Sequence, residues 1–283
     1  MMRAEVLLRI VRPADVFLMG TGVIVGYVVS TGTLPISTEL LAGAVSCGIY
    51  TAFAMVTNDI IDIEADKVNE PSRPIPSGKL SPKEALIYSF VLLTLGFVTA
   101  SLAANIWFLC VPPVVALASV AYNLYLKRIG FLGNILVSAL VASAFIGGGL
   151  LAVGHIDMYL LLFALMAFVG NLGREVHKGI ADVEGDKKKG VRTVAVAYGA
   201  WKAKVLSVSL YSLAILLALV PIALGITNQY YPFAIAVVAM CLLISSARVL
   251  KMDDSKALRR EKNLVRVWML FALVAFVIGA LRI

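Results

Sequence analysis

The chain has 283 residues, of which 60% are hydrophobic and 15% are charged, and its mean hydropathy is +0.92. Soluble domains are typically about half apolar and about a quarter charged, so this composition excludes an ordinary soluble domain and indicates a multi-spanning membrane protein. The net charge of +8 would otherwise suggest a nucleic-acid partner, but basic loops that face anionic lipid and phosphate explain it better, and we expect no nucleic-acid binding.

Nine apolar segments approach the length needed to cross a bilayer, which is about 20 mostly apolar residues. They run roughly over residues 15–30, 40–58, 85–104, 107–126, 132–153, 158–176, 203–224, 231–250 and 264–281. The loops between them are short, so the sequence predicts one all-α transmembrane domain over residues 1–283 and no soluble domain. Cys47, Cys110 and Cys241 lie singly in apolar segments and are interpreted as small core residues.

The basic residues are distributed asymmetrically between the two sets of loops. All of the 25 lysines and arginines except Arg282 lie at the amino end or beside the loops that follow even-numbered segments. Positively charged loops stay on the cytoplasmic side of a membrane, so this asymmetry supports the count of nine segments. We therefore expect a multi-pass protein of the cell membrane whose amino end and even-numbered loops are cytoplasmic and whose carboxyl end lies outside.

A polar stretch from Asn58 to Gly78 follows the second apolar segment. If the helix continues, Asn58, Asp62 and Asp66 lie at positions i, i+4 and i+8 on one helix face, where the like-charged carboxylates repel each other. Carboxylate and amide oxygens suit a hard cation, and Mg²⁺ usually takes few protein ligands together with water and substrate phosphates. The stretch is therefore interpreted as a magnesium site that opens onto a phosphorylated ligand; the alternative is a solvated acidic helix end.

The acidic pattern occurs twice. The second copy follows 120 residues later, where Asp62, Glu64, Asp66 and Lys67 recur as Asp182, Glu184, Asp186 and Lys187. Both copies follow even-numbered segments, as expected for a duplicated helical unit, and acidic residues at membrane depth are usually functional. We predict that the two copies face one cavity. Together they supply the candidate catalytic residues and metal ligands, which are Asn58, Asp62, Asp66, Asp182 and Asp186.

Basic residues beside the two acidic copies are candidates for neutralising a diphosphate that bridges bound metal ions. These residues are Arg73, Lys127, Arg128, Arg174 and Lys178. Lys178 precedes Asp182 by four residues, so an ordinary ion pair within one helix is an equally good interpretation. The prolines and the glycine between Pro71 and Gly78 predict a rigid loop, which could hold Arg73 over the site.

Two other features are interpreted as structural. The glycines at 147–149 precede no phosphate-loop lysine, so close helix packing explains them better than ligand binding does. His177 lies near the second acidic copy, but with no second histidine beside it we expect a core or surface role rather than metal binding.

The polar stretches resemble the signatures of the UbiA-type intramembrane prenyltransferases. The first signature is matched by Asn58, Asp59, Asp62, Asp66, Asn69, Pro71, Arg73, Pro74, Ser77 and Gly78. The second is matched by Asp182, Glu184, Gly185, Asp186, Gly190 and Thr193. Tyr122 with Lys127 and Arg128 resembles the family's connection between spans four and five, and Arg12-Pro13 resembles the start of its first span.

This resemblance covers nearly the whole chain. It implies nine transmembrane helices around a central cavity, with Tyr122 among the residues that bind substrate. It also implies Mg²⁺-dependent transfer of an isoprenoid from its diphosphate to a lipophilic acceptor.

Within the family, the Glu184-Gly185-Asp186 element and the sequence from Arg174 to Lys178 most resemble the archaeal ether-lipid branch. That branch implies transfer of a geranylgeranyl group to the hydroxyl of geranylgeranylglyceryl phosphate, a lipophilic phosphorylated acceptor. Homogentisate-type and chlorophyll-synthase members share the Glu-Gly-Asp element, so an aromatic or chlorophyllide-like acceptor is the alternative.

Two other classes of membrane protein also use spaced carboxylates. A cation transporter built from inverted acidic repeats would have no need of the loop from Pro71 to Gly78, and the repeats here follow helices of the same orientation. A CDP-alcohol phosphotransferase has Asp-Gly followed by Ala-Arg before its last two aspartates, and neither acidic copy has that context. The prenyltransferase is therefore the preferred interpretation.

Overall fold

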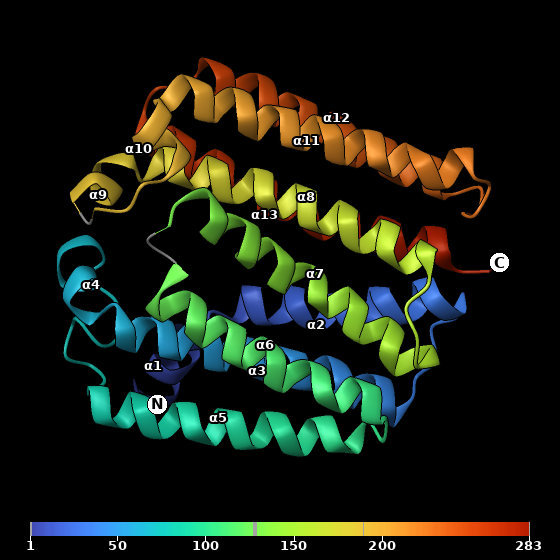
Figure 1. Ribbon diagram of the computed structural model, residues 1–283, viewed down its shortest axis with the longest axis horizontal. Coiled ribbons are helices and arrows are strands. Elements are labelled where there is room, and N and C mark those ends of the chain that lie inside the picture. Colours follow the sequence, from blue (N-terminus) through green and yellow to red (C-terminus); the bar gives the residue numbers. More distant parts are fainter. Residues whose placement is uncertain (1, 127–128, 189, 283) are drawn as a thin grey trace.

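The computed structural model describes residues 2–126, 129–188 and 190–282, and every regular element among them is a helix (Figure 1). Nine helices within these ranges are long and apolar enough to cross a membrane. They are α2 (Pro13–Thr31), α3 (Thr38–Ile61), α5 (Pro82–Leu102), α6 (Ile106–Leu124), α7 (Phe131–Val153), α8 (Met158–Ala181), α11 (Ala200–Ala223), α12 (Tyr231–Lys251) and α13 (Ser255–Ala280). The short helices are α1 (Met2–Val11), α4 (Ile63–Asn69), α9 (Val183–Lys188) and α10 (Val194–Tyr198). The predicted all-α membrane architecture is confirmed.

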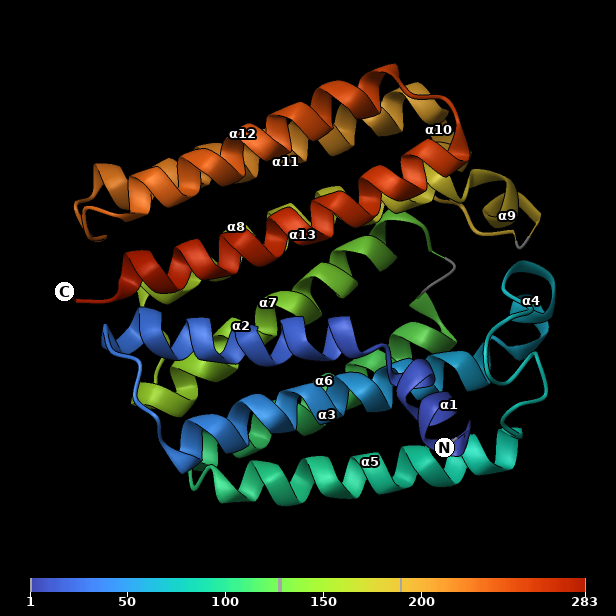
Figure 2. The same cartoon turned by 180° about the vertical axis from the view of Figure 1, so that it is seen from behind.

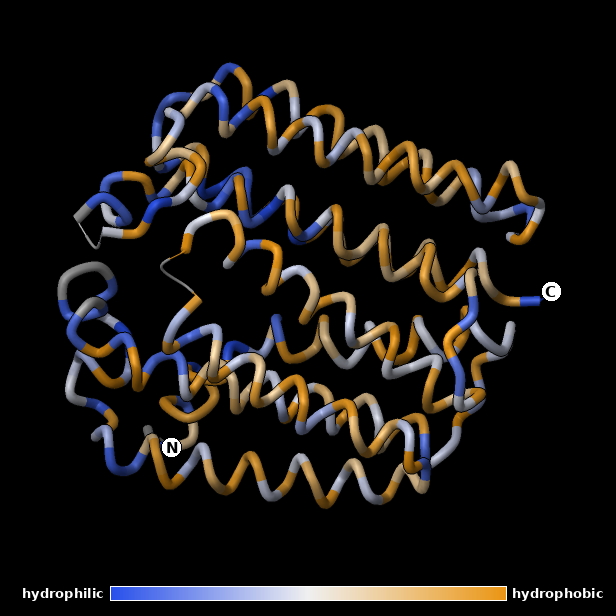
Figure 3. Tube along the Cα trace, in the orientation of Figure 1, coloured by the Kyte–Doolittle hydropathy of each residue, from blue (hydrophilic) through white to orange (hydrophobic). Residues whose placement is uncertain are grey.

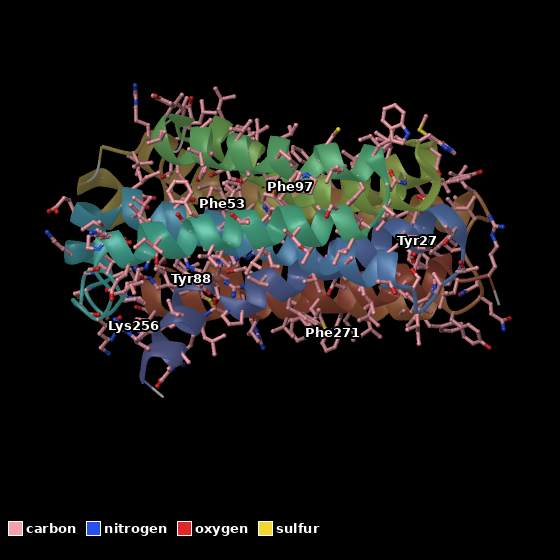
Figure 4. The ribbon with its side chains drawn as sticks, turned by 90° about the horizontal axis from the view of Figure 1, so that it is seen from below. Tyr27, Phe53, Tyr88, Phe97, Lys256 and Phe271 are labelled. Carbon is pink, nitrogen blue, oxygen red and sulfur yellow. The ribbon has the colours of Figure 1, made fainter. Side chains whose placement is uncertain are left out.

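The long helices run side by side, and the two ends of the bundle differ in polarity. Hydrophilic residues gather at the end that carries α4 and α9, whereas the helices between the ends are mostly hydrophobic (Figure 3). Large apolar side chains such as Phe97 and Phe271 are exposed on the outside of the bundle (Figure 4). Exposed apolar surface of this extent suits contact with lipid rather than with water. The chain is a multi-pass membrane protein.

The sequence repeat corresponds to a repeat in the fold. Helices α3 and α8 each have 24 residues, and their first residues, Thr38 and Met158, are separated by the same 120 positions as the acidic copies. The packing is repeated as well, because the contacts α2–α3, α3–α5 and α5–α6 correspond to α7–α8, α8–α11 and α11–α12. The two acidic copies therefore lie at equivalent places in two similar groups of helices.

Helices α2 and α7, which begin the two groups, pack against each other in the middle of the bundle (Figure 2). Their backbones approach so closely that a Cβ atom on Gly148 would overlap the backbone oxygen of Val23, and one on Gly26 would overlap the backbone oxygen of Phe145. Small residues permit such close helix contacts in membranes. The interpretation of the glycines at 147–149 as packing residues is confirmed at Gly148.

The last helix begins earlier than the hydropathy pattern predicts. Helix α13 starts at Ser255 rather than near residue 264, and the side chain of Asp254 caps it by accepting a hydrogen bond from the Ala257 backbone N–H at 2.8 Å. Hydropathy places charged residues outside a span, but here the first turns of the helix carry charges toward the polar end of a cavity. As a result, Arg259 and Lys262 belong to the same helix as Arg266 and not to a loop.

Candidate active site

A cavity of about 720 Å³ lies between the helices, and its lining includes polar residues of the α4–α9 end. Every described residue that the sequence assigned to the site lines it: Asn58, Asp62, Asp66, Arg73, Tyr122, Arg174, Lys178, Asp182 and Asp186. Lys127 and Arg128, which were also candidates, lie outside the described residues. Tyr122 on α6 interacts electrostatically with Asp62 of the first copy and with Asp186 of the second. The two acidic copies therefore share one cavity.

Each acidic copy contains a helix break at its first aspartate. Helix α3 ends at Asp62 with φ −90° and ψ 8°, and helix α8 ends at Asp182 with φ −110° and ψ 12°. The prediction of an uninterrupted helix from Asn58 to Asp66 is therefore wrong, although the Asp66 N–H still donates to the Asp62 carbonyl at 2.8 Å. Aspartate competes with the helix backbone for hydrogen bonds, and backbone near φ −90° and ψ 0° is common at active sites.

Arg73 forms ion pairs with carboxylates at the first acidic copy. Its guanidinium forms an ion pair with the nearly buried Asp66 and another, at 3.3 Å, with Asp59. The loop that carries Arg73 is closed by backbone hydrogen bonds from Ser77 to the Arg73 carbonyl at 3.0 Å and from Leu80 to the Pro74 carbonyl at 3.1 Å. The structure thus places Arg73 beside the first copy on a hydrogen-bonded loop, and the rigidity of that loop stays a prediction.

Asp59 and Arg12 form a second pair behind Arg73, to which the sequence analysis assigned no role. Asp59 is only 2% exposed, and the Arg12 guanidinium donates to it at 2.6 Å. Arg12 has φ 53°, a left-handed conformation that is unusual outside glycine, and the following Pro13 disfavours the α-helical alternative. Asp59 thus joins the arginine before α2 to the arginine of the loop. The usable signal was the acidic residue directly after Asn58, three residues before Asp62.

The second copy has its own basic partners. Asp182 pairs with Arg259 of α13 at 2.9 Å, and the buried Glu175 accepts from Arg174 at 3.1 Å and from Lys178 at 3.4 Å. Lys178 thus forms an ion pair within its own helix, as one of the two interpretations expected, but its partner is Glu175 one turn earlier and not Asp182. His177, in the same helix, is completely buried and lies outside the cavity lining, in agreement with a core role.

Three cations of α13 also line the cavity, although the sequence indicated none of them as a site residue; Arg259 and Lys262 were expected in the loop before the last span and Arg266 near the start of that span. Arg259, Lys262 and Arg266 are spaced by three and four residues, so they lie on one helix face. Arg266 forms an ion pair at 3.6 Å with Asp15 in the first turn of α2. The spacing itself was the missed signal, since it continues into the apolar residues of the same segment.

The cavity charge indicates how a metal ion could be held. Seven acidic and seven basic side chains line it among the described residues, so they balance each other and leave no surplus positive charge for a diphosphate. Within the same part of the chain, no three histidine, cysteine or acidic side chains gather closely enough to form a ready-made metal site. Mg²⁺ needs few protein ligands when phosphate oxygens complete its shell. The oxygen donors therefore fit Mg²⁺ bound together with a diphosphate.

The fold and the cavity define an intramembrane protein in which two aspartate-containing helix junctions meet above an apolar space. The sequence signature of the UbiA prenyltransferase family matches residues 19–274, and the chain belongs to this family of prenyltransferases. The digeranylgeranylglyceryl phosphate synthase of Thermococcus kodakarensis is 34% identical to this chain, and the similarity covers 99% of each of the two proteins. The enzyme of the same name from Methanocaldococcus jannaschii is 32% identical, over 100% of this chain and 99% of that protein.

Solved structures agree with this family. A structure described as giving insights into digeranylgeranylglyceryl phosphate synthase in membranes is 31% identical, covers 100% of both chains and has a TM-score of 0.77. A UbiA homolog from Archaeoglobus fulgidus bound to GPP and Mg²⁺ is 18% identical, covers 96% of this chain and 99% of that chain, and has a TM-score of 0.71. At 18% identity, the similarity to the Archaeoglobus fulgidus homolog shows a shared fold only.

Proposed function

We propose that the protein transfers a geranylgeranyl group from geranylgeranyl diphosphate to the hydroxyl of geranylgeranylglyceryl phosphate, in the synthesis of archaeal-type ether lipids. The observation that carries the proposal is the meeting of both aspartate junctions and their basic partners at the polar end of one largely apolar cavity. Full-length similarity to the synthases of two archaea supports the choice of substrates.

The reaction exchanges one carbon–oxygen bond for another. The allylic C1–O bond of the donor breaks and its electron pair leaves with the diphosphate. The acceptor hydroxyl oxygen then forms an ether bond to C1, and the hydroxyl proton is released. Apolar walls formed by residues such as Val111, Met166 and Phe276 exclude water, which would otherwise trap the allylic cation.

In this proposal the two acidic copies bind Mg²⁺ through Asn58, Asp62, Asp66, Asp182 and Asp186. Bound Mg²⁺ stabilises negative charge on the departing diphosphate oxygens. The structure of the Archaeoglobus fulgidus homolog with GPP and Mg²⁺ supports the choice of this metal and of a prenyl diphosphate ligand.

The described basic residues near the junctions are assigned to the phosphate groups. Arg73 stands over the first copy, and Arg174 and Lys178 stand beside the second. Arginine binds two phosphate oxygens at once through its planar guanidinium, whereas lysine acts as a point charge. Tyr122, which interacts with both copies, is assigned to the substrate as well.

The orientation in the membrane is also proposed here. The polar end that carries α4 and α9 faces the cytoplasm, and so does the amino end. The support is the sequence pattern, in which every lysine and arginine except Arg282 lies at the amino end or beside the loops after even-numbered spans. An excess of lysine and arginine marks cytoplasmic loops.

Purified protein incubated with radiolabelled geranylgeranyl diphosphate tests the proposed reaction. The acceptor panel contains geranylgeranylglyceryl phosphate, its dephosphorylated alcohol, 4-hydroxybenzoate and homogentisate, each with Mg²⁺ and with EDTA. We expect a labelled ether product with the phosphorylated acceptor, formed only when Mg²⁺ is present. Labelling of an aromatic acceptor alone would establish the alternative function.

A further inference from the structure

Helix α13 presents one continuous face to the cavity, and this face changes from cationic to apolar along its length. The residues on it are Arg259, Lys262, Arg266, Met269, Leu273 and Phe276. Their spacings of three and four residues place them on one side of a helix. The other side carries exposed apolar residues, including Phe271 (Figure 4). One helix face thus offers charge at its start and hydrocarbon contact further along.

The three cations differ in whether a carboxylate neutralises their charge. Arg259 is paired with Asp182 at 2.9 Å and Arg266 with Asp15 at 3.6 Å. In the part of the chain that the structure describes, Lys262 has no carboxylate partner within 4.0 Å. It is half-buried and interacts electrostatically with the carboxylates of Asp182 and Glu175 as well as with two more cations, Lys178 and Arg174 of α8. A partly buried charge without a direct ion pair is costly, and a bound anion would offset that cost.

The chemistry of this face differs from that of the aspartate junctions. None of the α13 residues that line the cavity is a carboxylate, and Glu261 is buried elsewhere, with Arg248 at 3.8 Å. Arg259, which pairs with Asp182, is where this face borders the junction of α8 with α9. An anion bound along α13 therefore contacts cations directly and needs no metal ion. A phosphate monoester with a long apolar chain fits such a face, because its head meets Lys262 and its chain follows the apolar residues.

We propose that Lys262, flanked by Arg259 and Arg266, binds the phosphate of the lipid acceptor, and that Met269, Leu273 and Phe276 line its isoprenoid chain. The diphosphate donor is then held separately, at the junctions of α3 with α4 and of α8 with α9. This inference rests on the proposed function for the identity of the acceptor. It adds a residue that determines selectivity for a phosphorylated acceptor.

The decisive variant is Lys262→Gln, which removes the charge and keeps a polar side chain. A hydrogen bond to a charged group is strong enough to raise the KM for geranylgeranylglyceryl phosphate about ten- to a hundred-fold. The KM for geranylgeranyl diphosphate should stay within about two-fold, so the same measurement reports whether the variant is folded. Lys262→Arg should restore most of the acceptor affinity. Lys256→Gln is the matched control, since Lys256 is an exposed lysine of the same helix outside the cavity lining (Figure 4).

A comparison of two acceptors separates this inference from the proposed function. Wild-type protein should prefer geranylgeranylglyceryl phosphate to its dephosphorylated alcohol, and Lys262→Gln should lose that preference. A wild-type protein that prenylates neither acceptor contradicts the proposed function, and with it the identity of the acceptor. Normal prenyl transfer with an unchanged acceptor KM in Lys262→Gln contradicts the inference alone. So does a variant whose only change is its response to anionic phospholipid in nanodiscs, which would make α13 a site for bulk lipid.

Discussion

Arg259 lies 2.9 Å from Asp182 and so connects the first turns of α13 to the junction between α8 and α9. Asp66 in the first copy is held in the same way, by Arg73 from the loop after α4. Each acidic copy thus places one of its proposed metal ligands in an ion pair with an arginine from another segment. This arrangement determines which variants separate metal binding from phosphate binding.

Asp62→Asn and Asp182→Asn should each abolish measurable turnover while leaving the protein folded. Loss of a metal ligand removes several kcal/mol of stabilisation from the developing charge, which corresponds to about a hundred-fold or more in rate. Asparagine keeps a hydrogen-bond acceptor at each position, and the ion pair that Asp182 loses to the exposed Arg259 contributes less than about 1 kcal/mol, so the metal-free thermal midpoint should change little. Glu64→Gln is the control, because Glu64 is exposed, outside the cavity lining and paired with Lys67. Near-normal turnover of either aspartate variant at saturating Mg²⁺ would contradict the two-copy site.

Arg73→Ala should weaken binding of geranylgeranyl diphosphate about ten- to a hundred-fold, since one charge-assisted contact to phosphate is lost. Arg73→Lys should recover only part of the loss because it lacks the planar guanidinium. Calorimetry with Mg²⁺ alone and with Mg²⁺ plus diphosphate measures both effects, and the exposed Lys67→Ala is the control. If diphosphate affinity stayed the same and metal affinity rose, Arg73 would be a counterion of the carboxylates only, as in the transporter alternative.

Gly148→Ala should lower the thermal midpoint in detergent, whereas Gly147→Ala should not. A methyl group at Gly148 overlaps the backbone of Val23, which can yield only if α2 and α7 separate, and overpacking of this kind costs about 1–3 kcal/mol. At Gly147 the nearest atom is a ring carbon of Phe108 at 3.5 Å, an ordinary contact. Equal midpoints for the two variants would show that the seam between α2 and α7 is not tightly packed.

Cysteine labelling tests the orientation proposed from the charge asymmetry. On a background without Cys47, Cys110 and Cys241, a cysteine at Ser72 should react with a membrane-impermeant reagent only from the cytoplasmic side. A cysteine at His155, in the loop between α7 and α8, should react only from outside. Both side chains are exposed, so access alone does not distinguish them. The reverse pattern would overturn the orientation while leaving the fold intact.

Much of the architecture could be predicted from the sequence. The features that could not be predicted share one physical cause. Length and hydropathy identify the spans because a bilayer demands long apolar helices. The prolines after α4 indicated the loop that holds Arg73. Hydropathy averages over a window, however, so it placed the first cations of α13 in a loop, although they face the polar end of the cavity. Likewise, only the tertiary structure shows that Asp59 is buried between Arg12 and Arg73, because those residues are far apart in the chain.

The arginine that pairs with Asp66 also bears on the order in which ligands bind. A divalent cation that arrives alone competes with the Arg73 guanidinium for Asp66. A diphosphate that arrives alone meets a lining in which the described acidic and basic side chains are equal in number. When both arrive, Arg73 exchanges the carboxylate for a phosphate, so it keeps an ionic partner. Under the proposed function, metal and donor are therefore thermodynamically linked, and each increases the affinity for the other by the same factor. We expect the two to bind as one complex, with positive cooperativity that weakens when Arg73 is replaced.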